Sequence, residues 1–365
     1  MKKYKFPEPD VNEFKNILLR KTKGSRVHSM ELHIDNDIIS FLWENYLGKE
    51  WIEPVDYETK KKSLKNIVEL YRMLGFDVVR LYSSFRFDSN IIFPRKEIPV
   101  RDTAALSQGE RRWADEHEGI IKNWDDFYNY PWPEPEKVNT WVFEYLSEIL
   151  PSDMGIFLCL SQGPFEILMF LLGFENLCYL MYEDEKLVSE MAEKIGSIIY
   201  ETNKRFLNID KIIGIFQSDD MGFKTQTLVS PEFLKKYTLP WHKKLSDLCH
   251  KNNKHYVIHS CGNLEQLMDY LIEEVKIDAR HSFEDEVMPV IQFKQKYGER
   301  VGIIGGVDVG KLCTLKEDEL RKYVRNILEN CAGSGYILGS GNSIANYVPP
   351  ENFLIMLDEG YRFRL

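Results

Sequence analysis

The chain has 365 residues and carries 57 acidic against 47 basic side chains, which gives a formal charge of −10. This acidic balance argues against general binding to nucleic acids, which needs a basic surface, and against anionic membranes as partners. Apolar residues make up 44% of the chain, which is enough for a large core, and single α/β barrels often reach this length. We therefore expect one domain over residues 1–365.

The cysteines and the N-terminus indicate the compartment. The first residues, MKKYKFPEPDVNEF, are charged and polar, so no signal peptide is expected. The most apolar stretch, residues 165–182, contains Glu166 and Glu175 and is therefore expected to be a buried helix rather than a membrane span. These features, with cysteines that lack the spacing of a disulfide framework, predict a reduced, cytoplasmic protein. The six cysteines are Cys159, Cys178, Cys249, Cys261, Cys313 and Cys331.

Eight strand-like runs alternate with amphipathic segments along the chain. In chain order they are residues 27–34 (VHSMELHI), 77–82 (DVVRLY), 155–160 (GIFLCL), 212–217 (IIGIFQ), 255–259 (HYVIH), 277–281 (IDARH), 301–305 (VGIIG) and 336–339 (YILG). Alternating strands and helices indicate a parallel α/β sheet, and eight such units favour a (β/α)8 TIM barrel with an N-terminal extension. The alternative is an open doubly wound sheet, which is disfavoured because no G-x-G-x-x-G turn follows these strands.

One connection is unusually long. Between the second and third strands, residues 84–135 show no clear periodicity and are rich in arginine, aspartate and aromatic residues. A loop of this length in a compact domain is usually functional or disordered, and the aromatic content favours an ordered segment. We expect residues 84–135 to form a lid insertion over the mouth of the barrel.

The sharpest local feature is the run His259-Ser260-Cys261 at the end of the fifth strand. Barrel enzymes carry their catalytic groups at the carboxyl ends of the strands. Residues i and i+2 of a strand point to the same side, so this imidazole and thiolate can converge on one metal ion. Zinc suits the nitrogen and sulfur pair best, and an open coordination position would make the metal catalytic. The alternative is a buried cysteine packed beside a hydrogen-bonded histidine.

Further candidates follow other strands. His281 and Glu284, in the run RHSFED after the sixth strand, suit metal binding or acid–base catalysis, although acidic residues are also common in the first turn of a helix. Asp219 and Asp220 follow the fourth strand. Neighbouring residues of an extended strand face opposite ways, so at most one of the two points into the mouth, and Asp220 is our catalytic candidate.

Three more positions complete the candidate set. Glu31 shares a strand face with His33, which suits either catalysis or a salt bridge. Asp308 follows the seventh strand and Asn342 the eighth, where we expect them to contact a cofactor.

Several stretches taken together are specific enough to indicate a family. They are GPFEILMFLLGFENL, SDDMGFKTQTLVSPEFLKKYTLP, HSCGN, GGVDV and YILGSGNSI, with PPENF downstream. With them the chain resembles the uroporphyrinogen decarboxylase superfamily over nearly its whole length, and most closely the cobalamin-dependent methyltransferase branch. The resemblance implies a (β/α)8 barrel, which agrees with the independent count of strands.

The resemblance also implies a zinc site. The methyltransferases carry an H-x-C motif followed much later by a second cysteine, and His259 and Cys261 match the first two ligands. The position of the second cysteine is occupied here by Asn342, whose neutral amide is a poor zinc donor. We therefore expect an acidic or imidazole side chain to replace it, the alternative being a site without metal. The candidates for this replacement are Glu31, Asp220, Glu284 and His281.

For the activity, the resemblance implies zinc-assisted methyl transfer between a small methylated substrate and a corrinoid on a separate protein. A carboxylate or imidazole in place of the second thiolate leaves a harder zinc, which favours a methyl ether over a thiol. One alternative is a decarboxylase of a porphyrinogen or related acid, although the N-terminal arginine run of true uroporphyrinogen decarboxylases is missing. The other is a degenerate barrel that only binds a ligand. The sequence does not define an oligomeric state.

Overall fold

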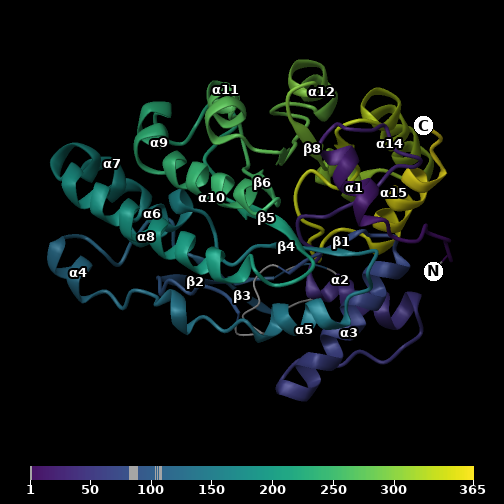
Figure 1. Cartoon of the computed structure of the whole chain (residues 1–365), viewed down its shortest axis with the longest axis horizontal. Helices are drawn as coiled ribbons and strands as arrows, with labels where there is room; N and C mark the ends of the chain where they lie inside the picture. Colours follow the sequence, from purple (N-terminus) through teal and green to yellow (C-terminus); the bar gives the residue numbers. More distant parts are fainter. Residues whose placement is uncertain (1, 82–88, 103, 105, 107–108) are drawn as a thin grey trace.

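The computed structural model describes residues 2–81, 89–102, 104, 106 and 109–365. Its core is one curled sheet of seven parallel strands whose spatial order follows the chain order. Helices surround this sheet (Figure 1), so strand and helix alternate as the sequence predicts. The strands are β1 Val78–Arg80, β4 Gly155–Leu158, β5 Ile212–Ser218, β6 His255–His259, β7 Ala279–His281, β8 Gly302–Ile304 and β9 Tyr336–Ile337.

The helices lie in the connections and at both ends of the chain. Before β1 lie α1 Val11–Leu18, α2 Asn36–Phe41, the π-helix Leu42–Tyr46 and α3 Tyr57–Met73. Between β1 and β5 lie α4 Trp124–Asn129, the 3-10 helix Pro135–Lys137, α5 Trp141–Ile149, α6 Pro164–Leu172, α7 Phe174–Glu183 and α8 Glu185–Phe206. After β5 follow α9 Pro231–Tyr237, α10 Leu239–Lys251, the 3-10 helix Glu265–Leu267, α11 Met268–Tyr270, the π-helix Leu271–Val275, α12 Val290–Tyr297, α13 Val309–Thr314, α14 Glu317–Cys331 and α15 Pro350–Arg362.

Seven of the eight predicted strands are confirmed, whereas the expectation that residues 27–34 form the first strand is not confirmed. This segment runs parallel to the end of β9 and makes only isolated bridges, such as that of Ser29 with Leu338. On its other side the Arg80 guanidinium donates to the Leu32 carbonyl at 2.5 Å, where a neighbouring strand would otherwise supply an N–H. Because a side chain takes the place of a backbone ladder, the described sheet has seven strands.

The inside of the curled sheet is apolar at one end and polar at the other. Side chains alternate between the two faces of a strand, so every second residue points inward. His259 and His281 have the same parity as Val257 and Ala279 and lie two residues further toward the carboxyl ends. The apolar cluster that fills the amino-terminal end, together with buried side chains of α1, consists of Val11, Phe14, Ile17, Leu18, Met30, Leu32, Val78, Phe157, Phe216, Val257, Ala279, Ile304 and Ile337.

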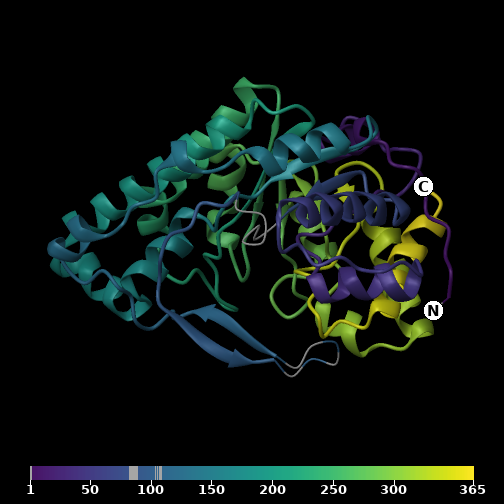
Figure 2. The same cartoon turned by 90° about the horizontal axis from the view of Figure 1, so that it is seen from below.

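A hairpin outside the main sheet belongs to the segment after β1. Its strands are β2 Glu97–Arg101 and β3 Glu110–Ala114, which pair antiparallel (Figure 2). Arg111 of β3 forms ion pairs with Asp35 at 2.8 Å and with Asp102 at 2.5 Å, so the hairpin contacts the loop that follows residues 27–34. Of the expected insertion, residues 84–88, 103, 105, 107 and 108 lie outside the described residues.

The most apolar stretch of the sequence folds as two helices rather than one. α6 and α7 meet at Gly173, whose φ of 76° suits glycine, and their axes bend by 93°. Every residue of α6 except Glu166 is buried, as predicted for a core helix. Among the described residues no single helix has the length and apolarity of a membrane span, although this bent pair passes that test together.

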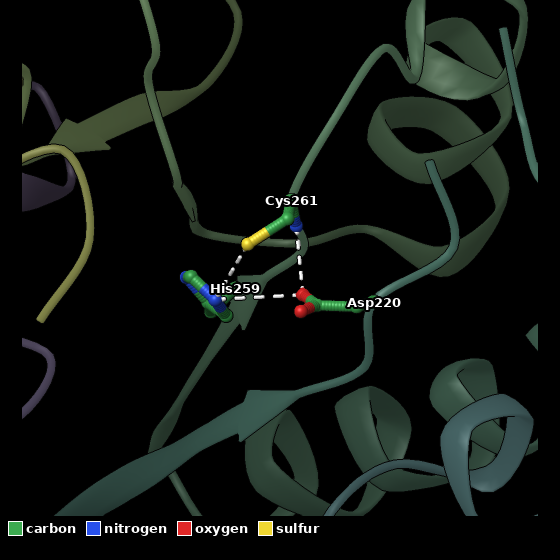
Figure 3. A group of neighbouring side chains, drawn as sticks. All are labelled: Asp220, His259 and Cys261. Carbon is green, nitrogen blue, oxygen red and sulfur yellow. Dashed lines mark hydrogen bonds and ion pairs between the residues drawn. The ribbon is translucent and has the colours of Figure 1, made fainter. Parts of the chain in front are cut away.

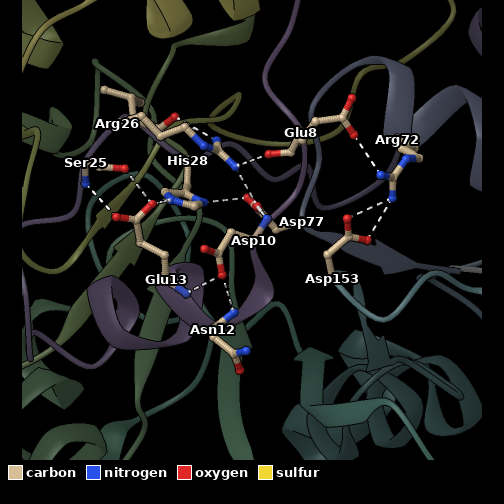
Figure 4. A network of polar contacts seen from close by, with 11 residues as sticks. Glu8, Asp10, Asn12, Glu13, Ser25, Arg26, His28, Arg72, Asp77 and Asp153 are labelled. Carbon is tan, nitrogen blue, oxygen red and sulfur yellow. Dashed lines mark hydrogen bonds and ion pairs between the residues drawn. The ribbon is translucent and has the colours of Figure 1, made fainter.

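A buried polar network ties the N-terminal segment to β1 (Figure 4). Its centre is the Asp77 carboxylate, which is fully buried immediately before β1. Asp77 accepts hydrogen bonds from the Asp10 backbone N–H at 2.6 Å and from Arg26 at 2.8 Å, and lies 2.7 Å from His28 Nδ1. The other ring nitrogen of His28 lies 2.9 Å from the Glu13 carboxylate of α1. The network thus fixes α1 against the amino-terminal end of the sheet.

We predict that Asp77→Ala lowers the free energy of unfolding by about 3 kcal/mol, because removing one member of a buried ionic network leaves the others desolvated and unpaired. Urea denaturation measures the loss. The matched control is Glu134→Ala, which breaks the exposed ion pair with Lys137 and should leave the free energy of unfolding nearly unchanged. Equal midpoints for the two variants would contradict a central role for the network.

Candidate metal centre

Three potential metal ligands converge at the carboxyl ends of β5 and β6 (Figure 3). His259 is the last residue of β6, Cys261 follows two residues later, and Asp220 lies two residues beyond β5. His259 Nε2 is 3.5 Å from Cys261 Sγ and 3.5 Å from Asp220 Oδ1. All three ligand atoms lie within 4.8 Å of one another. Strand ends therefore bring one nitrogen, one sulfur and one oxygen donor to a common point.

This spacing fits a tetrahedral metal ion. Bonds of about 2.0 Å to nitrogen and oxygen and about 2.3 Å to sulfur place tetrahedral ligand atoms about 3.3–3.5 Å apart. The two distances from His259 Nε2 match these edges. The mixed set of imidazole, thiol and carboxylate is one that zinc accepts. The residues present thus fit a zinc ion with one coordination position left for a ligand.

A chain of hydrogen bonds fixes the tautomer of His259. The Ser340 carbonyl can only accept, so His281 Nε2, 3.1 Å away, must carry a proton. Burial, and then the neighbouring His259, lower the pKa of His281 well below its ordinary value, so its Nδ1 is an acceptor. His259 Nδ1, 2.7 Å from that atom, therefore donates to it. The lone pair of His259 is left on Nε2, which faces Cys261 and Asp220.

The Cys261 thiol lies among polar groups from three other segments. Asn342 Nδ2 donates to Cys261 Sγ at 3.3 Å, and the hydroxyl of Ser282 lies 3.7 Å from the same sulfur. The side-chain oxygen Oδ1 of Asn342 meanwhile accepts from the Ser343 N–H. Burial, and then the nearby Asp220, raise the pKa of the thiol above its ordinary value. Asn342 therefore presents its amide N–H groups to the sulfur, and its oxygen is turned away.

The two neighbouring aspartates have different surroundings. Asp219 is fully buried; its carboxylate accepts from the backbone N–H groups of Phe165 and Glu166 at the start of α6, and lies 2.7 Å from His242 Nε2. Asp220 instead accepts from the Cys261 backbone N–H at 2.8 Å and faces the metal centre. The opposite orientation of adjacent residues on an extended chain separates a helix-capping carboxylate from a potential ligand.

Glu31 is a buried acid joined to the centre through Ser340. The Ser340 N–H donates to the Glu31 carboxyl at 3.0 Å, and Ser340 Oγ lies 2.5 Å from Glu31 Oε2. Ser340 Oγ also lies 2.7 Å from the backbone carbonyl oxygen of Asn342, which can only accept, so the single hydroxyl proton of Ser340 points there. The proton between the hydroxyl and Glu31 then belongs to the carboxyl group. Burial agrees with this assignment, because it raises the pKa of Glu31 to about 8.

The remaining candidates lie around the centre or take part in the fold. Glu284 lines a small cleft next to Cys261 rather than joining the three ligands. Asp308 caps α13 by accepting from the Lys311 N–H and also accepts from the Asp285 N–H, so both of its oxygens hold backbone donors.

Sequence reasoning did not single out Ser282 or give Glu166 a place at the site. Ser282 has a φ of 108°, a backbone conformation that is uncommon for serine and that the sequence does not predict. Glu166 belongs to α6, where burial, and then Asp220 and Asp219, raise the pKa of its carboxyl well above the usual value. The sequence feature that could have placed Glu166 at the site is its position two residues after Pro164, in the turn that follows β4.

We predict that His259 of the metal-free protein stays neutral from pH 8 to pH 5, with its proton on Nδ1. Burial, aided by the positive charges of Arg80 and Arg280, lowers its pKa to about 3, so the neutral form persists above that pH. Nitrogen-15 NMR of the imidazole distinguishes the tautomers. His250 serves as the internal control, because its hydrogen bond to Asp278 raises its pKa and it should titrate in the same spectra. A proton on Nε2, or titration of His259 near pH 6.5, would contradict the hydrogen-bond chain.

Comparison with known proteins places the chain in a family. Residues 121–363, about two thirds of the sequence, match the family model described as Uroporphyrinogen decarboxylase (URO-D). A comparison with curated proteins gives no match. A solved methyltransferase from Methanosarcina mazei superposes with a TM-score of 0.68 at 14% identity, covering 95% of this chain and 97% of that one. A B12-independent methionine synthase from Shewanella sp. W3-18-1, in complex with selenomethionine, gives 0.53 at 14% identity, over 83% and 87%. These likenesses show the fold alone, whereas the family match confirms the resemblance seen in the sequence: the chain belongs to the uroporphyrinogen decarboxylase (URO-D) family.

Proposed function

We propose that this protein is a methyltransferase that moves a methyl group between a small methylated substrate and a corrinoid on a partner protein, assisted by zinc. The observation that carries the proposal is the convergence of Asp220, His259 and Cys261 with tetrahedral spacing. Three protein ligands leave one position for a substrate atom, which is the pattern of catalytic zinc sites. The fold shared with the Methanosarcina mazei methyltransferase supports this activity, and the corrinoid follows from the family resemblance.

Zinc held by these residues would supply a Lewis acid for the heteroatom that carries the methyl group. One thiolate and one carboxylate balance the two positive charges of the ion, and His259 contributes a neutral nitrogen. Compared with a site that has two thiolates, this donor set is harder and favours oxygen as the substrate atom. We therefore propose a methyl ether as the methyl donor.

We propose Glu31 as the acid that protonates the leaving group. An ether oxygen that loses its methyl group leaves as an alkoxide and needs a proton, which a positioned acid delivers. Because burial raises the pKa of Glu31 to about 8, its Oε2 holds a proton at neutral pH. His281 positions His259 through the 2.7 Å contact of their Nδ1 atoms. Glu284, which lines the adjacent cleft, is a second group for proton transfer.

Two architectural expectations also belong to the proposal. Residues 27–34 would fill the place of an eighth barrel strand, since they lie beside the end of β9 and hold the guanidinium of Arg80. Of the expected insertion, the hairpin of β2 and β3 would form part of the wall of the substrate site, which the ion pair between Arg111 and Asp35 supports. Asn342 would act on the metal through the Cys261 sulfur, and a cofactor contact of Asp308 would require its capping bonds to break.

A second candidate is decarboxylation of a porphyrinogen or related acid, which the name of the family model favours. Such a substrate needs cationic side chains for its carboxylates. Arg80 lies buried inside the curled sheet, but its guanidinium donates to the Leu32 and Phe216 carbonyls and to the Ser218 hydroxyl. A barrel that binds its ligand without turnover is the third possibility, which the experiments below distinguish.

We predict that the purified protein binds about one zinc per chain and that the double variant His259→Ala, Cys261→Ala binds none, as measured by metal analysis after dialysis. Asp220→Asn should weaken zinc affinity at least tenfold, because an amide oxygen is a poorer donor than a carboxylate.

The matched control is Asp219→Asn, one residue away. Asp219 holds the start of α6 and His242, so this variant should lose stability while keeping the zinc stoichiometry. Unchanged metal content in the double variant would remove the basis of the proposed site.

We predict that the zinc-loaded protein transfers methyl groups from methoxylated compounds to a reduced corrinoid, followed by the absorbance of cobalt, faster than it methylates simple thiols from a methylated corrinoid. Glu31→Gln should slow ether cleavage by about 10²-fold or more, the usual contribution of a general acid, without changing zinc content. Rapid thiol methylation without ether cleavage would reverse the choice of substrate. Tetrapyrrole turnover without metal favours decarboxylation, and ligand binding without turnover favours the non-catalytic barrel.

A further inference from the structure

The hairpin of β2 and β3 is held at its two ends and has little support between them (Figure 2). Among the described residues its strands pair only with each other, and every residue of β2 is exposed. Of the described residues between the strands, Ala104 is buried and Leu106 packs against the core. A two-stranded hairpin alone is only marginally stable in water. The contacts at its two ends therefore decide whether the hairpin stays in place.

The end of the hairpin that joins the core is fixed by aromatic and backbone contacts. Arg95, two residues before β2, lies over the ring of the buried Phe170 of α6 at 4.7 Å. Glu116, two residues after β3, accepts at its carbonyl oxygen a hydrogen bond of 2.8 Å from the N–H of Phe174, the first residue of α7. Neither contact is an ion pair, so screening by salt affects this end little.

The other end is held by one cation among three carboxylates. The Arg111 guanidinium of β3 forms ion pairs with Asp35 at 2.8 Å, with Asp37 at 3.3 Å and with Asp102 at 2.5 Å. Asn346 Nδ2 donates to Asp102 at 2.6 Å and to Asp37 at 3.3 Å. Asp102 follows directly after β2, whereas the other two carboxylates lie before and within α2. The side chains of Arg111 and Asp37 are 34% and 36% exposed, so salt in the solvent reaches this cluster.

The face of the hairpin that carries Arg111 is otherwise apolar. Cross-strand partners share a face, and the register pairs Ile98 with Trp113 and Val100 with Arg111. Ile98 and Val100 are each 41% exposed, and Trp113 is 58% exposed. Because Arg111 reaches Asp35, this face is directed at the loop after residues 27–34, at the carboxyl-end side of the curled sheet. Three large apolar side chains are thus held at this rim without being packed into the core.

We propose that the hairpin is a releasable strap at the rim of the curled sheet, with Arg111 as its latch and the contacts to α6 and α7 as its hinge. The inference goes beyond the proposed function and does not depend on it, because the charges hold the hairpin whatever reaction the metal centre catalyses. Release of the latch would uncover this side of the sheet and free the apolar face of the hairpin for contact with a partner at the same rim.

The latch depends on a balance of charges. Without the guanidinium, Asp102 on the hairpin would face Asp35 and Asp37 on the main body, and like charges at such distances repel each other. The hydrogen bond from the Ala104 N–H, joined by those from Asn346 and Arg111, outweighs burial and lowers the pKa of Asp102, so this carboxylate is ionised at neutral pH. Loss of the single cation therefore turns an attraction between hairpin and rim into a repulsion.

The test measures backbone hydrogen exchange of the purified full chain by mass spectrometry, with α8 as the internal reference. Raising sodium chloride from about 0.01 M to about 1 M shortens the screening length from about 30 Å to about 3 Å. We expect this change to speed exchange in β2 and β3, whereas the segment around Phe174 at the hinge keeps its rate. In Arg111→Gln the hairpin should exchange about tenfold faster at low salt. Added salt should slow exchange in this variant, because it screens the repulsion that remains among the three carboxylates.

Arg112→Gln is the matched control. Arg112 is the next residue of β3, is exposed and points to the opposite face, so this variant removes the same charge without touching the latch. It should keep the wild-type exchange rates and the wild-type response to salt. Arg111→Lys keeps the charge but loses the planar fork of N–H donors, so its exchange should lie between those of wild type and Arg111→Gln.

Hairpin exchange in Arg111→Gln equal to that of wild type overturns the proposal, and so does an equal effect of Arg112→Gln. If α8 of Arg111→Gln also exchanges faster, the variant has lost general stability and the salt series of wild type decides. A wild-type hairpin whose exchange does not respond to salt then overturns the latch. These readouts involve neither zinc nor turnover, so a failure of methyl transfer and a failure of the latch are distinguishable.

Discussion

The alternation of side chains along parallel strands is the constraint on which the site depends. In β6 and β7 the inward positions carry Val257 and Ala279 first, and His259 and His281 two residues later. The same parity that fills the amino-terminal end of the curled sheet with apolar side chains thus delivers two imidazoles to the opposite end. A shift of either strand by one residue would turn its histidine outward, and the core residue two positions earlier would turn outward as well. Packing of the core and placement of the site are therefore specified together.

Burial then sets the protonation of these groups. Above the apolar layer the charged form of each isolated group is disfavoured, which keeps His259 neutral, raises the pKa of Glu31 to about 8 and raises the pKa of the Cys261 thiol. Binding of the proposed zinc would change the balance for the thiol, because a metal ion would replace its proton and compensate its charge. Glu31 is not one of the three grouped ligands and would retain its proton. One low-polarity environment would thereby yield a ligand and an acid from two groups that both ionise poorly in isolation.

Much of the fold was predictable because hydrophobic runs and polar strand ends are local properties. Seven strands lie where the periodicity predicts them, and Asp219 and Asp220 face opposite ways as an extended chain requires. Residues 27–34 have the pattern of a strand, but the sequence does not reveal that the Arg80 side chain satisfies a carbonyl on one edge. The hydrogen bond of His281 with the Ser340 carbonyl joins residues 59 positions apart, and such a long-range contact could not be predicted from local patterns either.

The departure at Asn342 is best understood as a redistribution of charge around the metal centre. In the methyltransferase pattern that the sequence resembles, this position supplies a second thiolate, whereas here it supplies an N–H donor to Cys261 Sγ. With the proposed zinc bound, such a donor would withdraw electron density from the sulfur and make it a weaker ligand. The carboxylate of Asp220, 3.5 Å from His259 Nε2, would restore the lost negative charge with a harder atom. Both changes would make the metal ion more electrophilic. The substitution would therefore alter the character of the proposed site rather than delete it, as long as Asp220 stays ionised. Burial works against that condition by raising the pKa of Asp220, while the Cys261 backbone N–H opposes the rise through its 2.8 Å hydrogen bond. The backbone turn of the His-x-Cys motif thus supports the carboxylate that completes its own ligand set.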